Sequence, residues 1–182
     1  MIPGIAHLRE LRKKGGGKTE TKTGGAAAAG VDGDGVLCYD KGEGGVTMNR
    51  YPWLEELLCA MPGCTRDYKV EWGWQRYRVG GKLFAATCQP GPEHKGYDCR
   101  ELISLKCEPE RAELLRAEFP DIIPGFYLDK RNWNSEFLDG AVPEDVLREL
   151  CVRSYRLVFQ KMTKKQQREI LKNADLDVGS GR

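Results

Sequence analysis

The sequence predicts an α+β domain in which an antiparallel sheet has helices packed on one face, preceded by a disordered tail rich in glycine and alanine. Three observations lead to this fold class. Composition changes sharply near residue 48, extended segments follow one another through short turns, and segments with helical spacing of apolar residues stand between them. Strands joined in this way pair antiparallel and commonly pack one face against helices.

Residues 1–47 have the composition of a flexible tail. They hold twelve of the 22 glycines but only one of the 16 aromatic residues, so they cannot bury enough apolar surface to offset their chain entropy. One hypothesis is that translation starts at Met48 and that the upstream segment is not part of the native protein. We expect the folded domain to span residues 48–172 and residues 173–182 to be disordered.

The first half of the domain has the pattern of one helix followed by extended segments. Pro52 opens a helix whose apolar residues recur at helical spacing as far as Met61, and Pro62-Gly63 ends it. Gly80-Gly81 has the length and composition of a two-residue hairpin turn, and residues 89–100 form a loop. The expected extended segments are Tyr68–Trp72, Trp74–Val79, Lys82–Cys88 and Leu102–Cys107.

The second half alternates helices and strands. The helix from Pro143 is the clearest, because apolar residues line one face and two Glu–Arg pairs at i,i+4 lie on the other. Asp129-Lys130-Arg131-Asn132 forms the corner between two strands. The other expected elements are a helix from Pro109 to Phe119, strands at Phe126–Leu128 and Trp133–Leu138, and a short helix at Lys164–Lys172.

Charge and composition exclude several classes of protein. The net charge of +2 is near neutral, so binding to a polyanion must depend on where cations gather. No apolar run approaches the ~20 residues of a membrane helix, and the N-terminus lacks the order of a secretory signal. We therefore expect a cytoplasmic protein with no membrane contact.

Neither a metal nor a cofactor is expected. The seven cysteines show no CxxC spacing, and the two histidines complete no zinc-binding pattern with them. In the tail, Gly15-Gly16-Gly17-Lys18-Thr19 lacks the first glycine and the preceding buried strand of a phosphate-binding loop.

An enzymatic site is also not expected. A cysteine nucleophile needs a neighbouring base, and His94, in a Pro/Gly loop, is the imidazole that the domain offers to Cys88 or Cys99. No spacing favours either partnership, so the sequence predicts a non-enzymatic protein.

Four collinear segments resemble a known family. They are VEWGWQRYRVGGKLFA at 70–85, ISLKCEPERAELLR at 103–116, YLDKRNWNSEFLDG at 127–140 and SYRLVFQKMTKKQQ at 154–167. Together they resemble the MmcQ/YjbR family over about residues 48–170. The resemblance implies a YjbR/CyaY-like double-wing fold, related in shape to the frataxin-like arrangement, and it implies DNA binding, the label commonly given to this family.

Three groups of cations could contact phosphates, because nucleic-acid binding needs cations that replace counterions on one face. They are a basic corner at residues 130–134, the hairpin, and the C-terminal helix. In the corner, Trp133 and Asn134 are the residues expected to read bases. The candidate nucleic-acid-binding residues are Arg76, Arg78, Lys82, Lys106, Lys130, Arg131, Trp133, Asn134, Lys164 and Lys165.

Each candidate also has a structural interpretation. Trp133 is bulky enough to belong to the core, and Lys130-Arg131 could serve only to solvate a turn or to pair with Asp129. Lys106 lies in a strand between core residues and could simply face outward. The basic C-terminal run also suits helix-dipole complementation and solubility.

The alternative function is a small-molecule or protein-binding module of the same fold. Trp72, Trp74, Tyr127 and Trp133 would then line an aromatic pocket. The two hypotheses differ in where the indoles point: exposed indoles beside cations favour nucleic acid, and indoles that converge on a concave apolar site favour a small ligand. The sequence leaves the oligomeric state and any DNA sequence preference open.

Overall fold

The computed structural model describes residues 51–97 and 99–179, all of which belong to the unit Lys41–Arg182. The expected tail at residues 1–47, the hypothetical start at Met48 and residues 180–182 lie outside the described residues. Within the described part of the chain, no helix combines the length and apolar character needed to span a membrane.

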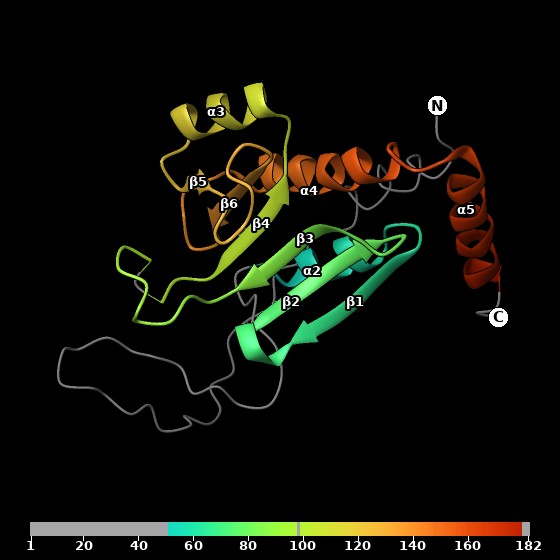
Figure 1. The fold of residues 1–182 in the computed structure, drawn as a ribbon, viewed down its shortest axis with the longest axis horizontal. Helices are drawn as coiled ribbons and strands as arrows, with labels where there is room; N and C mark the ends of the chain where they lie inside the picture. The colour runs from blue at the N-terminus through green and yellow to red at the C-terminus, as the bar shows by residue number, and fades with distance from the viewer. Residues whose placement is uncertain (1–50, 98, 180–182) are drawn as a thin grey trace, which may run out of the picture. The chain divides into compact units, whose positions relative to one another are not determined.

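One sheet of six strands forms the centre of this unit, in the order β1-β2-β3-β4-β6-β5, and each strand runs antiparallel to its neighbours (Figure 1). The predicted α+β fold with an antiparallel sheet is therefore confirmed. The strands are β1 (Cys64–Lys69), β2 (Trp74–Val79), β3 (Lys82–Cys88), β4 (Leu102–Lys106), β5 (Ile122–Pro124) and β6 (Trp133–Phe137).

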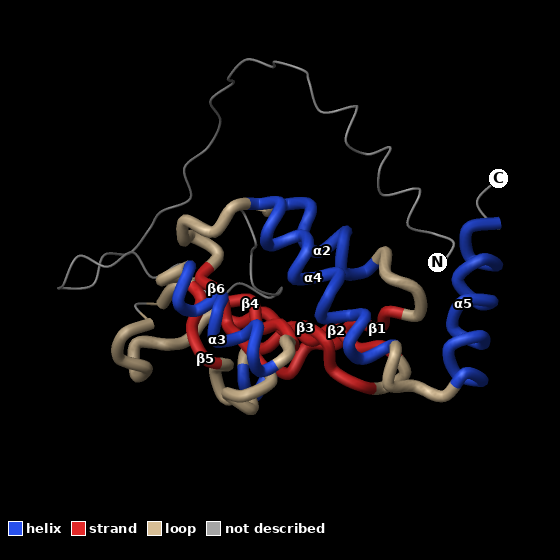
Figure 2. Tube along the Cα trace, turned by 90° about the horizontal axis from the view of Figure 1, so that it is seen from above, coloured by secondary structure: helices blue, strands red, loops and turns tan. Residues whose placement is uncertain are grey.

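Helices cover one face of the sheet, and we call it the helix face. Figure 2 shows two of them, α2 (Pro52–Cys59) and α4 (Glu144–Phe159), on the same side of the strands. The main apolar core lies between these helices and the strands, and α3 (Pro109–Glu118) adds Ala112 and Leu115 to it. Tyr77 and Ile103 point into this core from the strands and are fully buried.

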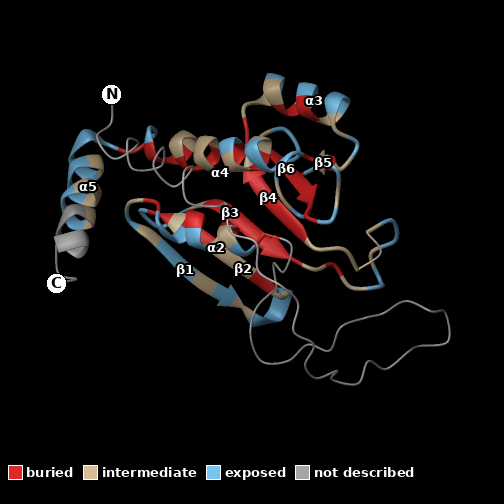
Figure 3. Ribbon diagram, turned by 180° about the vertical axis from the view of Figure 1, so that it is seen from behind, coloured by how far each residue is buried: buried red, intermediate tan, exposed pale blue. Residues whose placement is uncertain are grey.

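The opposite face of the sheet, which we call the open face, is covered in part by loops. A second apolar cluster there joins Trp74, Cys88, Leu102 and Phe137 of the strands to Phe126 of the loop after β5. Figure 3 shows β3 and β4 mostly buried, whereas the residues of the edge strand β1 are exposed or half-buried.

A single hydroxyl on α4 fastens that helix to two strands. The register between β2 and β3 shifts between Tyr77 and Arg78, which marks an irregularity at Phe84. The Ser154 hydroxyl donates a hydrogen bond to the carbonyl of Phe84 and accepts one from the backbone amide of Lys106, at 2.7 Å. Because these groups are buried, their pairing with Ser154 explains a polar residue on the apolar face of α4.

Two predicted strands are misplaced. The first strand spans Cys64–Lys69, and Val70–Trp72 is a 3-10 turn rather than part of the strand. The strand expected at Phe126–Leu128 lies instead at Ile122–Pro124, because the amide of Phe126 bonds to the Ser135 hydroxyl, at 2.9 Å, and leaves the ladder.

The last helix, α5 (Lys164–Gly179), runs beyond the expected end at Lys172. The prediction of disorder from residue 173 is thus corrected for residues 173–179, where no proline or glycine interrupts the helix before Gly179.

Candidate nucleic-acid interface

The register of the strands places a row of cations on the open face. Along β2, Tyr77 and Val79 point to the helix face, so Trp74, Arg76 and Arg78 point to the open face. Arg76 lies opposite Ala86 of β3, and the same row continues through Ser104 and Ser135. The small residues of this row leave the long arginine side chain room to lie over the middle of the sheet.

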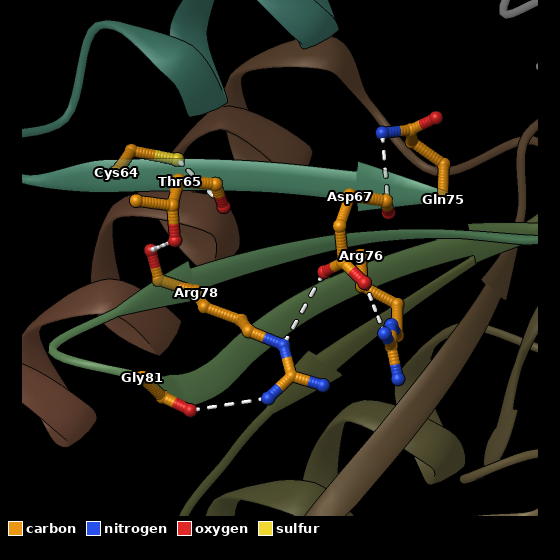
Figure 4. Close-up of polar contacts among 7 residues, drawn as sticks. All are labelled: Cys64, Thr65, Asp67, Gln75, Arg76, Arg78 and Gly81. Atoms are coloured by element: carbon orange, nitrogen blue, oxygen red, sulfur yellow. Dashed lines mark hydrogen bonds and ion pairs between the residues drawn. The ribbon is translucent and has the colours of Figure 1, made fainter. Parts of the chain in front are cut away.

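A single carboxylate faces the two arginines (Figure 4). Asp67 of β1 forms ion pairs with the guanidinium of Arg76 and, at 3.4 Å, with Nε of Arg78. Arg78 also donates a hydrogen bond to the carbonyl of Gly81, at 3.1 Å. The hydrogen bond from Arg76 is the main cause that holds the pKa of Asp67 below its usual value, so this group of three residues carries a net positive charge.

Lys106 lies at the end of β4 on the same face, directly opposite Trp133. Its Nζ is 4.7 Å from the centroid of the Trp133 ring, which is close enough for a cation–π interaction. Burial, followed by the charge of Lys161, lowers the pKa of Lys106. The carboxylate of Asp129 acts in the opposite direction and raises this pKa, so it already neutralises part of the positive charge around Lys106.

Trp133 does not offer its ring to solvent. The residue is 6% exposed and lies beneath Lys106, so its expected role in reading bases does not fit its position. The structural interpretation fits better: Trp133 supports the ammonium group above it.

The side chain of Asn134 points to the helix face and is also buried. Its Oδ1 accepts a hydrogen bond from Nε of Arg116, at 2.8 Å, and its Nδ2 donates to the carbonyl of Ala112, at 3.3 Å. The amide therefore ties β6 to α3, and the prediction that Asn134 reads a base is corrected, because neither end of the amide is available.

The remaining candidates lie at the end of the sheet where β2 and β4 end and β3 and β6 begin, which we call the basic end of the sheet. Lys82 follows the hairpin turn, and Lys130 and Arg131 lie in the turn before β6; all three are exposed. None of them forms an ion pair with a carboxylate of the described residues. Arg78 and Lys106 belong to the same end of the sheet.

The start of α5 lies near this end. A Cβ built on Gly80 would come within 2.6 Å of the methyl carbon of Met162, so the hairpin turn packs against the connection between α4 and α5. Lys164 and Lys165 are exposed in the first turn of α5.

Two aromatic residues on the open face are exposed, and the sequence placed both in a pocket. Trp72 is 62% exposed and Tyr127 is 75% exposed, whereas Trp74 is buried beside Phe126. Trp133 lies opposite Lys106, whereas the row of Trp74 crosses β4 at Leu102, four residues earlier in that strand. The four rings therefore do not converge on one concavity, which gives less support to the aromatic pocket.

Asp67 and Lys69 also belong to the open face, although the sequence did not predict it. Lys69 Nζ is 5.7 Å from the centroid of the Trp72 ring, and Lys69 and Asp67 lie opposite Trp74 and Arg76. The available signal was the alternation of residues 64–69, which could not be used because the strand was expected to begin at Tyr68.

The described residues give no arrangement typical of a metal centre or a nucleophile. No group of three or more His, Cys, Asp and Glu side chains in residues 51–97 and 99–174 could hold a metal ion. Burial raises the pKa of Cys88 to about 12, which opposes formation of a thiolate. His94 lies with Nε2 3.3 Å from the carboxylate of Glu93.

Comparison with known proteins adds a family and a fold. Residues 59–157 match the model of the YjbR family. The chain is 33% identical over 106 residues to the protein named "Uncharacterized protein YjbR" of Escherichia coli strain K12, covering 57% of this chain and 84% of that protein. It is 35% identical over 102 residues to "Uncharacterized protein YyaQ" of Bacillus subtilis, covering 52% of this chain and 86% of that protein.

A solved structure agrees with this family. The crystal structure of Deinococcus radiodurans protein DR2400 is similar with a TM-score of 0.55 and 31% sequence identity, covering 64% of this chain and 84% of that chain.

Proposed function

The chain belongs to the YjbR family, and from that premise we propose that it is a non-enzymatic DNA-binding protein that contacts phosphates through the basic end of its sheet. The observation that carries the proposal is that Arg78, Lys106, Lys130 and Arg131 all lie at that end of the sheet, whereas Lys82, opposite Val79, points to the helix face there.

Electrostatics favour an anion at this place. Burial and, after it, the charge of Lys161 lower the pKa of Lys106, and Asp129 offsets part of this effect, so an approaching phosphate would relieve the repulsion that Asp129 leaves between the two ammonium groups. Each phosphate neutralised by lysine or arginine also releases counterions from the DNA, which is the main source of sequence-independent affinity.

The same charges set an upper limit on affinity. Asp67 neutralises part of the charge of Arg76 and Arg78, and the sequence pI of about 8.1 lies below the value above ~9 that is usual for strongly binding domains. We therefore expect weak binding that salt readily reverses.

The exposure of Trp72 separates this function from the alternative. An indole that is 62% exposed and lies beside the ammonium group of Lys69 fits an extended polyanion better than a small molecule enclosed in a pocket. The small-molecule or protein-binding module remains the second hypothesis, with less support from this geometry.

The test removes the two exposed cations of the basic corner. We expect Lys130→Ala combined with Arg131→Ala to weaken DNA binding about tenfold at low salt, because two phosphate contacts are lost. Fluorescence anisotropy with a labelled oligonucleotide measures the affinity. Tm should stay unchanged, because both side chains are exposed.

A matched control removes the same charge elsewhere. Lys95 is exposed in the loop after β3, and Arg66 is exposed on the helix face of β1, where it pairs with Glu55. The Lys95→Ala/Arg66→Ala variant should bind almost as the unmodified protein does. Equal losses in the two double variants would contradict a localised interface, and no binding by the unmodified protein even at low salt would refute the function.

A further inference from the structure

Two aromatic rings stand out from the open face at the end away from Lys106. Trp72 and Tyr127 are the exposed members of a connected set of rings whose inner members are Trp74 and Phe126. The ring centroids of Trp72 and Trp74 are 6.4 Å apart, those of Trp74 and Phe126 are 6.3 Å apart, and those of Phe126 and Tyr127 are 4.7 Å apart. Buried rings thus support both exposed ones.

The backbone holds both rings in these positions. Trp72 ends the 3-10 turn, and Gly73 follows it with a left-handed φ of 64°. Tyr127 itself has a φ of 49°, which is unusual for a bulky residue and costs conformational free energy. The exposed position of Tyr127 is therefore held at a cost in conformational free energy.

Cations lie alongside these rings on the same face of the sheet. Lys69 approaches the Trp72 ring, and the row on β2 continues from Trp74 to Arg76 and Arg78, over about 13 Å of strand. Beyond it lie Lys106 and the basic end. One surface thus has flat apolar rings at one side and cations at the other, while Arg76 between them is paired with Asp67 and its side chain is only 14% exposed.

This combination favours one form of nucleic acid. In a duplex the faces of the bases are stacked inside, where an aromatic side chain on a sheet surface cannot reach them. In a single strand the base faces are free, and proteins that bind single strands combine a basic path for the backbone with aromatic stacking.

We propose that the open face binds single-stranded nucleic acid, with Trp72 and Tyr127 stacking on bases and with Arg78 and Lys106 facing the phosphates. This inference rests on the proposed function and narrows it. DNA and RNA share the chemistry of stacking and phosphate contact, and the experiment distinguishes them.

The experiment compares three probes at about 50 mM salt. They are a labelled single-stranded DNA of about 12 nucleotides, the same DNA as a duplex, and single-stranded RNA of the same sequence. We expect either single strand to bind at least about tenfold more tightly than the duplex, because stacking adds to phosphate contact. Tryptophan fluorescence should be quenched when the single strand binds.

Variants then test the rings. Trp72→Ala should weaken binding of the single strand by about 5- to 100-fold, leave binding of the duplex unchanged and abolish most of the quenching. Tyr127→Ala should also weaken it. The matched control is Val70→Ala, since Val70 is 77% exposed in the same 3-10 turn and has no ring to stack.

The outcomes separate the two proposals. Equal or tighter binding of the duplex, or a Trp72→Ala variant that binds the single strand as the unmodified protein does, overturns the single-strand inference and leaves the DNA-binding function standing. Failure to bind any probe at low salt overturns both. Tighter binding of RNA than of DNA supports the single-strand inference and identifies RNA as the source of the strand.

Discussion

Glu136 is a buried carboxyl group in the middle of β6. It is 2% exposed, and its Oε2 has no hydrogen-bond partner in the described structure. Burial, followed by the charge of Asp121, raises its pKa to about 8, so the group is largely neutral at pH 7. A buried group that is kept neutral in this way makes stability depend on pH.

We predict that Glu136→Gln stabilises the protein increasingly as pH rises from 5 to 8. The pKa in the folded state lies above the ordinary 4.5, so the unfolded chain loses this proton first. The contribution of Glu136 to the free energy of unfolding is therefore fully present below pH 4.5, and it is lost as pH rises from there to about 8. The difference is on the order of 4 kcal/mol as an upper value.

Urea unfolding at several pH values measures it. Glu118→Gln, at an exposed position on α3, is the control and should show no such trend. A constant difference between Glu136→Gln and the unmodified protein across this pH range would show that Glu136 ionises normally in the folded state.

The hairpin between β2 and β3 determines where the basic end lies. Gly80 and Gly81 have φ values of 55° and 76°, as a two-residue turn of the mirror-image type requires. The turn packs against Met162 and Ile170, so it fixes the position of Lys82 relative to the start of α5.

We predict that Gly80→Ala destabilises the protein more than Gly81→Ala does. Both substitutions place a side chain in the left-handed region, at about 1–2 kcal/mol each. The new Cβ at position 80 would also meet Met162, whereas nothing lies within 4 Å of a Cβ at position 81. Thermal unfolding measures both variants, and equal losses would mean that Met162 moves aside without cost.

The molecule as a whole is almost neutral, so the local distribution of its charges matters more than their sum. A net charge of +2 provides little general attraction to DNA, so binding depends on the local groups at the basic end and on the open face. Salt dependence reports how many of these groups meet phosphates.

We predict that the logarithm of the affinity for single strands falls with the logarithm of salt concentration with a slope of about −3, as expected for about four phosphate contacts. Titrations between about 30 and 200 mM salt measure it. Lys130→Ala/Arg131→Ala should make the slope shallower, and Trp72→Ala should lower affinity with an unchanged slope. A slope near zero for the unmodified protein would show that phosphates are not the main contact.

Much of the candidate site could be read from alternation along strands. Arg76 and Arg78 share a face with Trp74 because successive residues point to opposite faces, and the Gly80-Gly81 turn fixes the strand that follows. The edge strand β1 could not be read in this way, since its residues are mostly polar and its start at Cys64 depends on pairing with Val79.

Local pattern therefore settled the antiparallel α+β class, the hairpin, the long helix α4 and the alternation that brings Arg76 and Arg78 to one surface. It could not settle which aromatic and amide groups stay in solvent. Trp133 and Asn134 are buried, while Trp72 and Tyr127 are exposed, because each depends on contacts with segments distant in the chain: Lys106, Arg116, Trp74 and Phe126. Burial is a property of the packed chain, and a residue's neighbours in sequence do not specify it.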